Sequence, residues 1–122
     1  DEFGLRSKLN QPASSLAYGD QRRLEIVRAL VLAPRVLMLD EPAAGMNEQE
    51  TEALGESLKW VHREADCALL VIDHDLKFIM TLCEKITVMN MGEILAKGSP
   101  SEIVKNKRVV EAYIGQEAVA AA

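Results

Sequence analysis

Two clusters of charged side chains each come directly after a short apolar run in this sequence. Asp40-Glu41 follows the run 36–39, and Asp73-His74-Asp75 follows the run 68–72. In a parallel sheet both clusters would lie beyond the carboxyl ends of the strands, which is where such sheets bind ligands. Carboxylates and an imidazole at one sheet edge can hold a divalent cation and activate a water molecule. The alternative is that polar residues end these strands only because the strands reach the surface there.

The pattern of apolar residues around these clusters predicts an α/β domain with a parallel sheet flanked by helices. The two runs are short and do not alternate with polar residues, which is typical of strands buried on both faces. We predict helices over 19–32, from 47 to about 65, and over 76–83. This alternation of helix and strand is the pattern of a parallel α/β fold.

The first predicted helix has an apolar stripe that faces a core. Leu24, Val27 and Val31 recur along it at helical spacing, and the Ala-Pro pair that follows ends the helix. Ser14 and Ser15 precede it and are candidate caps.

Local signals mark the other element boundaries. Asn47, followed three residues later by Glu50, is typical of a capping box at the start of a helix. Residues 86–96 contain two strand-like runs around an Asn-Met-Gly turn and predict a hairpin. We expect short helices over 100–105 and from 109 to 113.

Composition excludes several classes of protein. The chain has 122 residues, with 14 Lys and Arg against 19 Asp and Glu, so its formal net charge is −5. This acidic balance argues against a nucleic-acid partner. The longest apolar run, 67–72, is far shorter than the roughly 20 residues that cross a bilayer. Residues 1–3 begin no signal peptide and include no initiator Met, so we expect an excerpt or a processed product.

The two cysteines, Cys67 and Cys83, lie in apolar surroundings and form no CxxC pair. We therefore interpret them as reduced core residues of a cytoplasmic protein.

Several motifs occur here in an order and at a spacing that resemble the C-terminal half of an ATP-binding-cassette (ABC) transporter ATPase. Within that family, the chain is most similar to the subunits that power branched-chain amino-acid transport. The stretches that carry this resemblance are Leu16–Gly19, Arg22–Ile26, Asp40–Asn47 and Val110–Gly115. The resemblance covers nearly the whole chain and implies a partial P-loop NTPase fold.

The resemblance implies a role for each residue of the two charged clusters that matches the family's motifs. Asp40 resembles the Walker B aspartate, which helps to hold Mg²⁺ beside the phosphates of ATP. Glu41 resembles the catalytic glutamate that orients or deprotonates the attacking water, and a carboxylate beside metal-bound phosphate suits that task. His74 resembles the switch histidine that reaches the γ-phosphate. The other histidine, His62, is expected on the exposed side of a helix.

The resemblance also implies a nucleotide-binding signature at the start of the first helix. In the family this stretch contacts ATP bound by the opposite subunit, and the free N–H groups of a helix N-terminus attract anions. Its residues here are Leu16, Ala17, Tyr18, Gly19, Asp20 and Gln21. Ala17 stands where a serine is usual, Tyr18 where a glycine is, and Asp20 where a glutamine is. Asp20 adds negative charge near the expected anion site. The residues 43–47 resemble the D-loop that couples two subunits.

A phosphate-binding loop of the form G-x-x-x-x-G-K-[ST] does not occur in these residues, because none of the seven glycines is followed by a lysine. We therefore expect this chain alone to bind ATP only weakly and to be inactive as an ATPase. The strand that carries that loop in the family would also be missing from the sheet. We expect the chain to repack or to self-associate, because an open strand edge and uncovered apolar side chains are costly.

We interpret the whole chain, 1–122, as one incomplete ABC ATPase domain. Residues 1–33 would end the helical subdomain with the signature helix, residues 34–115 would form the Walker B and switch core, and 116–122 would be a tail. The resemblance implies ATP and Mg²⁺ as cofactors of the parent protein, and a second ATPase subunit and transmembrane permease subunits as partners. The parent would couple ATP hydrolysis to solute import at the cytoplasmic face of the membrane.

Two other interpretations remain open at this point. The chain alone is a structural or interaction remnant without nucleotide function, or it is a metal-dependent hydrolase that uses both charged clusters as ligands.

Overall fold

The structure is a computed structural model that describes residues 1–114. The chain divides into two compact units, the first from Asp1 to Phe78 and the second from Ile79 onward. Each is described by itself. The predicted tail, 116–122, lies outside the described residues.

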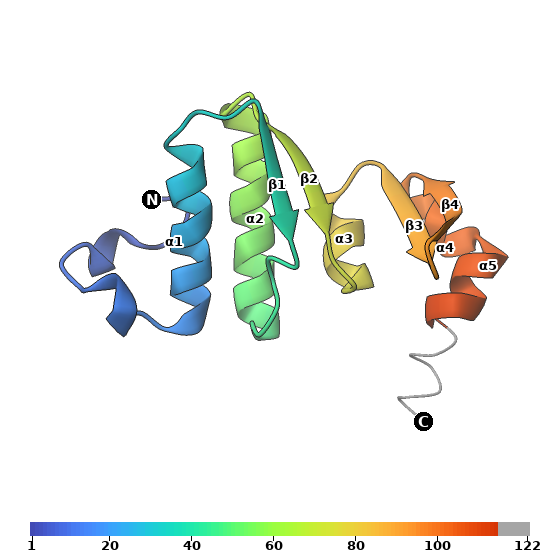
Figure 1. The fold of residues 1–122 in the computed structure, drawn as a ribbon, viewed down its shortest axis with the longest axis horizontal. Coiled ribbons are helices and arrows are strands. Elements are labelled where there is room, and N and C mark those ends of the chain that lie inside the picture. Colours follow the sequence, from blue (N-terminus) through green and yellow to red (C-terminus); the bar gives the residue numbers. More distant parts are fainter. Residues whose placement is uncertain (115–122) are drawn as a thin grey trace. The chain divides into compact units, whose positions relative to one another are not determined.

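The first unit contains the elements that carry the charged clusters (Figure 1). Two short 3₁₀ helices open the chain. The elements in order are η1 (Arg6–Lys8), η2 (Ala13–Ser15), α1 (Tyr18–Leu30), β1 (Val36–Asp40), α2 (Glu48–Glu64), β2 (Ala68–Ile72) and α3 (Leu76–Leu82), in which the boundary between the units falls.

The strands β1 and β2 form a parallel pair, as predicted. Val36 pairs with Ala68 and Asp40 pairs with Ile72, so both strands end at the same edge. The backbone N–H of Glu41 donates to the carbonyl of Ile72 at 2.7 Å and extends the pairing by one residue. This register places the two charged clusters side by side.

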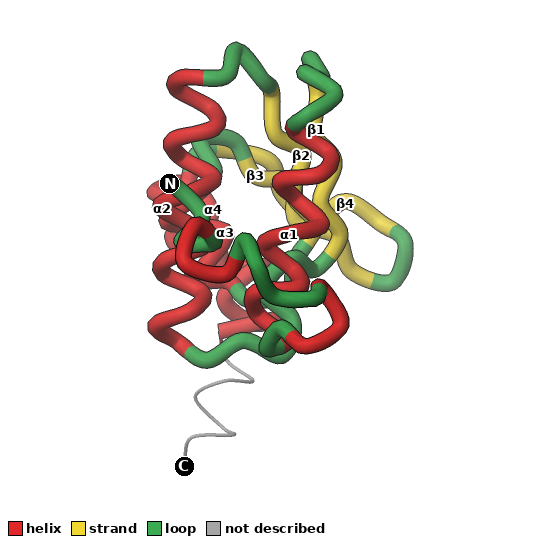
Figure 2. The backbone as a smooth tube through the Cα atoms, turned by 90° about the vertical axis from the view of Figure 1, so that its left-hand side faces the viewer, coloured by secondary structure: helices red, strands yellow, loops and turns green. Residues whose placement is uncertain are grey.

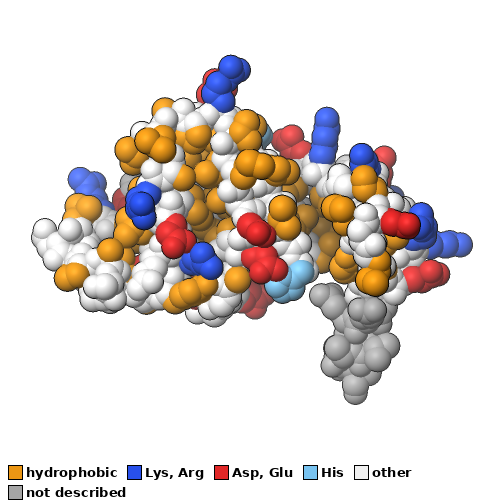
Figure 3. All heavy atoms as spheres, in the orientation of Figure 1, with side chains coloured by type: hydrophobic (Ala, Val, Ile, Leu, Met, Phe, Trp, Pro, Cys, Tyr) orange, Lys and Arg blue, Asp and Glu red, His pale blue; other side chains and the backbone are white. Residues whose placement is uncertain are grey.

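The prediction that both strands are buried on both faces is wrong. Leu37 and Leu39 are buried, but Met38 is 72% exposed and Ile72 is 60% exposed. The helix α2 lies behind the strand pair in Figure 1, and Figure 2 shows α2 and the strands on opposite sides of the unit. No helix among the described residues covers the front face of the strand pair in Figure 1. In the same orientation, Figure 3 shows hydrophobic side chains on the surface of the first unit.

The helix α2 supplies the core that covers the buried face of the strands. The predicted capping box is present: the side chain of Asn47 accepts from the N–H of Glu50, and Glu50 accepts from the N–H of Asn47. Leu54, Leu58 and Val61 are fully buried, as their spacing predicted.

The predicted caps of α1 are wrong. The N-cap is Ala17, which has no side-chain acceptor, and Ser15 belongs to η2, where its hydroxyl donates to the carbonyl of Pro12 at 2.8 Å. Val31 was predicted to lie in the apolar stripe but is 78% exposed, because α1 ends at Leu30.

The second unit begins with the predicted hairpin and ends in short helical turns. The hairpin joins β3 (Ile86–Asn90) to β4 (Glu93–Gly98) through Met91 and Gly92, both with positive φ, as a tight hairpin turn requires. The remaining elements are α4 (Pro100–Lys105), α5 (Lys107–Val109) and the π-helical η3 (Val110–Ile114), so the predicted helix over 109–113 falls across two turns.

Both cysteines are free thiols, as predicted; Cys67 is buried and Cys83 is half-buried, and burial raises the pKa of the Cys83 thiol. Within the described residues, no helix combines the length and apolar character that a membrane span needs.

Candidate functional site

The structure brings Glu41 and His74 into contact at the carboxyl edge of the strand pair. Glu41 directly follows β1, and His74 lies in the loop between β2 and α3. The Nδ1 atom of His74 lies 3.2 Å from Oε1 of Glu41, and both side chains are largely exposed. Asp40, which ends β1, is also exposed at this edge. The prediction that the two clusters converge is therefore confirmed in the geometry, whereas their roles remain predictions.

The backbone holds Glu41 in a conformation that non-glycine residues rarely adopt. Its φ is +47°, in the left-handed region that costs energy for a residue with a side chain. The N–H of Glu41 donates to Ile72, and its carbonyl accepts from the N–H of Ala44 at 3.1 Å. A second bond, from the N–H of Met46 to the carbonyl of Ala43 at 3.1 Å, extends this segment, and we call it the 41–46 turn. These bonds hold the backbone of Glu41 in this conformation.

The neighbours of the His74 ring indicate which of its two nitrogen atoms carries the hydrogen. An ionised carboxylate only accepts hydrogen bonds, so Nδ1 is the donor to Glu41 and carries a hydrogen. A second carboxylate oxygen, Oδ1 of Asp73, lies 3.8 Å from the same Nδ1. In the neutral ring Nε2 then carries no hydrogen and is an acceptor. It becomes a second donor when the ring is protonated.

Asp73 is the buried member of the second cluster. Its side chain is 3% exposed, and its Oδ1 accepts from the N–H of Asp75 at 2.9 Å. Its Oδ2 is buried and has no hydrogen-bond partner within the described part of the chain. Asp75 in turn accepts from the N–H of Phe78 at 3.0 Å and so caps α3. The cluster therefore holds the loop on which His74 sits, a role that the sequence did not predict for Asp73.

No group of three or more His, Cys, Asp or Glu residues among those described is arranged to hold a metal ion. The carboxylate of Asp40 nevertheless suits Mg²⁺, which is commonly bound through one or two carboxylates together with substrate phosphates and water.

The residues of the predicted signature lie at the start of α1. Gln21 donates from Nε2 to the carbonyl of Leu16 at 2.9 Å and ties the approach to the first turn. Asp20 is buried and forms ion pairs with Lys8 and with Arg23, the latter at 3.2 Å.

The negative charge expected to disturb an anion site is therefore neutralised within the chain. The i,i+3 spacing of Asp20 and Arg23 was visible in the sequence, but nothing local pointed to Lys8. The ring of Tyr18 lies against Gly45 of the 41–46 turn, so the signature stretch and the turn after Glu41 are neighbours. His62 is exposed on α2, as predicted.

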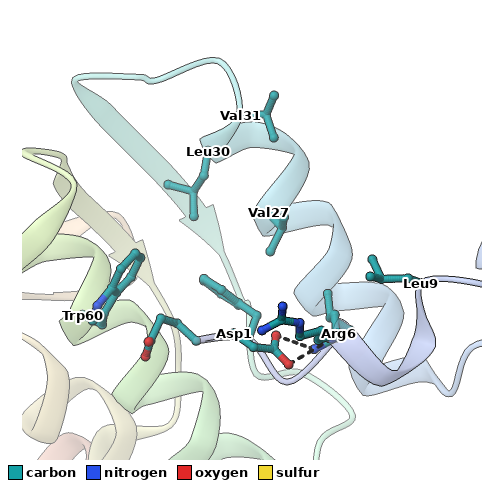
Figure 4. A pocket seen from close by; sticks show the side chains of 10 residues that line it. Asp1, Arg6, Leu9, Val27, Leu30, Val31 and Trp60 are labelled. Carbon is teal, nitrogen blue, oxygen red and sulfur yellow. Dashed lines mark hydrogen bonds between the residues drawn. The ribbon is translucent and has the colours of Figure 1, made fainter.

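A separate apolar hollow of about 660 Å³ lies between the N-terminal segment, α1 and α2 (Figure 4). Its labelled residues include Arg6, Leu9, Val27, Leu30 and Trp60. None of the residues predicted to contact nucleotide lines it.

Two protein families match different parts of the chain. The family described as ABC transporter matches residues 1–44, which include the signature stretch, Asp40 and Glu41. The family described as branched-chain amino acid ATP-binding cassette transporter matches residues 93–119.

Individual proteins agree with these matches. The chain is 47% identical over 116 residues to the high-affinity branched-chain amino acid transport ATP-binding protein LivG of Salmonella typhimurium, and 44% identical over 116 residues to BraF of Pseudomonas aeruginosa. The match covers 95% of this chain and 46% of each relative.

A solved structure has the same fold. The ADP conformation of MJ1267, an ATP-binding cassette of an ABC transporter, superposes with a TM-score of 0.81 at 26% identity. That match covers 93% of this chain and 46% of the other. The chain thus spans about half the length of the relatives it matches. On these matches the chain is similar to part of the ABC transporter ATP-binding proteins, and among them to those of branched-chain amino-acid transport.

Proposed function

We propose that the chain supplies the signature, Walker B and switch elements of an ATPase that powers solute import, with branched-chain amino acids as the transported class. The contact between Glu41 and His74 beside Asp40 carries this proposal, because an ATPase needs a carboxylate and a γ-phosphate sensor at one sheet edge. The similarity to LivG and BraF, which are ATP-binding proteins of branched-chain amino acid transport, supports the substrate class.

Each side chain at the edge has one task in this proposal. Asp40 would hold Mg²⁺ beside the phosphates, where the ion would supply positive charge to neutralise charge developing on them. Glu41 orients the attacking water and accepts its proton. His74 keeps Nδ1–H on Glu41 and, with its ring protonated, donates from Nε2 to an oxygen of the γ-phosphate.

The helix N-terminus of α1 provides the contact across the subunit interface. Ala17 offers no hydroxyl there, so the free backbone N–H groups of the first turn contact phosphate. Because Lys8 and Arg23 neutralise Asp20, this end of the helix keeps its attraction for an anion.

We further propose that the 122 residues form one incomplete ABC ATPase domain, with 1–33 ending the helical subdomain and 34–115 forming the Walker B and switch core. Its partners are a second ATPase subunit and permease subunits at the cytoplasmic face of the membrane. The 122 residues by themselves contain no phosphate-binding loop and are inactive in this proposal. Without the phosphate-binding loop and the strand that carries it, copies of the chain associate with one another through the uncovered face of β1 and β2.

A chimera tests this function directly. The 116-residue segment of Salmonella typhimurium LivG that matches this chain is replaced by this chain's own residues, and Mg-ATP hydrolysis is measured. We expect hydrolysis well above that of the 122-residue chain, which should be at background. A folded chimera that binds ATP but does not hydrolyse it would contradict the proposed roles.

A further inference from the structure

Tyr18, which occupies a position where the family usually has glycine, makes a close contact with the turn that carries Glu41. Tyr18 is the first residue of α1, and Gly45 lies in the 41–46 turn with φ of +76°. A Cβ atom at Gly45 would lie 2.9 Å from Cε1 of the Tyr18 ring, closer than real Cβ contacts allow. The ring therefore occupies the space that any side chain at Gly45 would need.

Arg22 fixes the ring from one turn further along α1. Its Nε donates to the Tyr18 hydroxyl at 3.0 Å, and its guanidinium carbon lies 5.3 Å from the ring centroid. Arg22 is held in turn by Glu25 at 3.0 Å. The hydrogen bond to Tyr18 is the largest cause that raises the pKa of Arg22.

A second close approach lies beside the first. A Cβ atom at Gly19 would lie 3.0 Å from Oε1 of Glu50, the residue that closes the capping box of α2. Two glycines, one on each side, thus let the N-terminus of α1 pack closely on the start of α2. The 41–46 turn, which precedes α2, contains two backbone hydrogen bonds of 3.1 Å. The N–H of Ala44 donates to the carbonyl of Glu41, and the N–H of Met46 donates to the carbonyl of Ala43.

From this geometry we propose that Tyr18 is a positioning residue: it braces the 41–46 turn and so fixes Glu41 relative to the signature stretch. Tyr18 acts through Gly45 and the turn and does not touch the reacting atoms. The inference rests on the proposed function for its catalytic meaning, but the contact itself can be tested in the 122-residue chain.

The first test measures amide hydrogen exchange in wild type and Tyr18→Ala. We expect the Ala44 and Met46 amides to exchange about tenfold faster in the variant, while those of Leu58 and Val61 in the middle of α2 keep their rates. Equal acceleration throughout the unit would mean that Tyr18 serves only global stability and would overturn the proposal. Tyr18→Phe keeps the ring, loses the hydroxyl that binds Arg22, and should show a smaller effect at the same two amides.

The second test uses the His74 ring, which contacts Glu41, as a spectroscopic reporter. Tyr18→Ala should shift the ¹⁵N signals of His74 and leave those of His62, the only other histidine, unchanged. Unchanged His74 signals would contradict the proposal.

A matched glycine pair separates the contact from backbone strain. Gly45→Ala and Gly92→Ala both force alanine into positive φ, but Gly92 has nothing within 4 Å of a Cβ. We expect only Gly45→Ala to shift His74, and the double variant Tyr18→Ala/Gly45→Ala to be less destabilised than the sum of the two. Simple additivity would count against the contact.

In the LivG chimera, Tyr18→Ala should lower kcat about tenfold with little change in the KM for ATP. A wild-type kcat in that variant would overturn the positioning role. An inactive parent chimera would instead refute the proposed function, and the exchange and His74 results would still decide whether Tyr18 braces the turn.

Discussion

The Glu41 carboxylate and the His74 imidazole lie 3.2 Å apart although 33 positions separate them in the chain. The parallel register that pairs Asp40 with Ile72 produces this contact, because it ends both strands at one edge. At the residue scale, the positive φ of Glu41 and the hydrogen bond from the Asp75 N–H to the buried Asp73 carboxylate shape the backbone on the two sides of this contact.

Replacing Glu41 by Gln in the LivG chimera should lower kcat by about 10²- to 10⁴-fold, because the amide cannot accept a proton from water. Steady-state hydrolysis of Mg-ATP measures this effect. Glu64→Gln, at the end of α2, is the matched control and should keep the parent rate. A Glu41→Gln chimera that retains the parent kcat would remove Glu41 from the mechanism.

Replacing Asp20 by Asn should lower the free energy of unfolding by about 1–3 kcal/mol, because Lys8 and Arg23 lose a buried partner. Urea unfolding of the 122-residue chain measures this loss. Glu56→Gln, which breaks an exposed pair with Lys59, is the control and should change the midpoint little. Equal effects of both variants would show that the Asp20 pairs are no stronger than surface pairs.

At the scale of elements, local signals in the sequence were sufficient where neighbouring residues determine the structure. The capping box of Asn47 and Glu50, the apolar spacing of α2 and the hairpin turn at Met91 and Gly92 were all predicted, since each depends on residues a few positions apart. The caps of α1 were predicted wrongly because the preceding segment coils into η2, which depends on Pro12 and not on the helix.

The candidate site divides in the same way. The convergence of the two charged clusters could be predicted from strand order, whereas the ion pair of Lys8 with Asp20 and the contact of Tyr18 with Gly45 could not. These contacts join segments far apart in sequence, and no periodicity or motif encodes their partners.

Asn47→Ala should destabilise the first unit by about 1 kcal/mol, because the N–H of Glu50 loses its side-chain acceptor, whereas the backbone N–H at position 47 still donates to the Glu50 carboxylate. Thermal unfolding with the second-unit hairpin as a separate probe measures this. Gln49→Ala, which lies in the first turn of α2 outside the box, serves as the control. A loss no larger than that of Gln49→Ala would mean that the box does not hold the start of α2.

At the scale of the whole molecule, the strands of the first unit carry more apolar surface than their neighbours in the described residues cover. Met38, Leu70 and Ile72 lie in β1 and β2 and are 72%, 49% and 60% exposed. The sequence predicted strands buried on both faces, and the structure covers one face. The apolar pattern of a strand indicates which of its faces are suited to burial, whereas actual burial depends on which elements pack against those faces.

The uncovered strand face predicts self-association of the 122-residue chain. Burial of each large apolar side chain contributes about 1.5–3 kcal/mol, so Met38→Thr with Ile72→Thr should weaken self-association at least about tenfold. Sedimentation equilibrium measures this change. Val104→Thr, at an exposed position of α4, is the control. A wild-type chain that stays monomeric at high concentration would contradict the expectation.

The most direct test of the account is a calorimetric titration of Mg-ATP into the 122-residue chain, with the LivG chimera titrated in parallel. The central claim is that the chain contains the catalytic carboxylate Glu41, the switch histidine His74 and the signature stretch of the proposed site. These residues do not include the loop that binds the phosphates. We predict no measurable binding by the chain and clear binding by the chimera. Micromolar binding of Mg-ATP to the chain alone would contradict the claim, because it would require these residues to hold the phosphates without that loop.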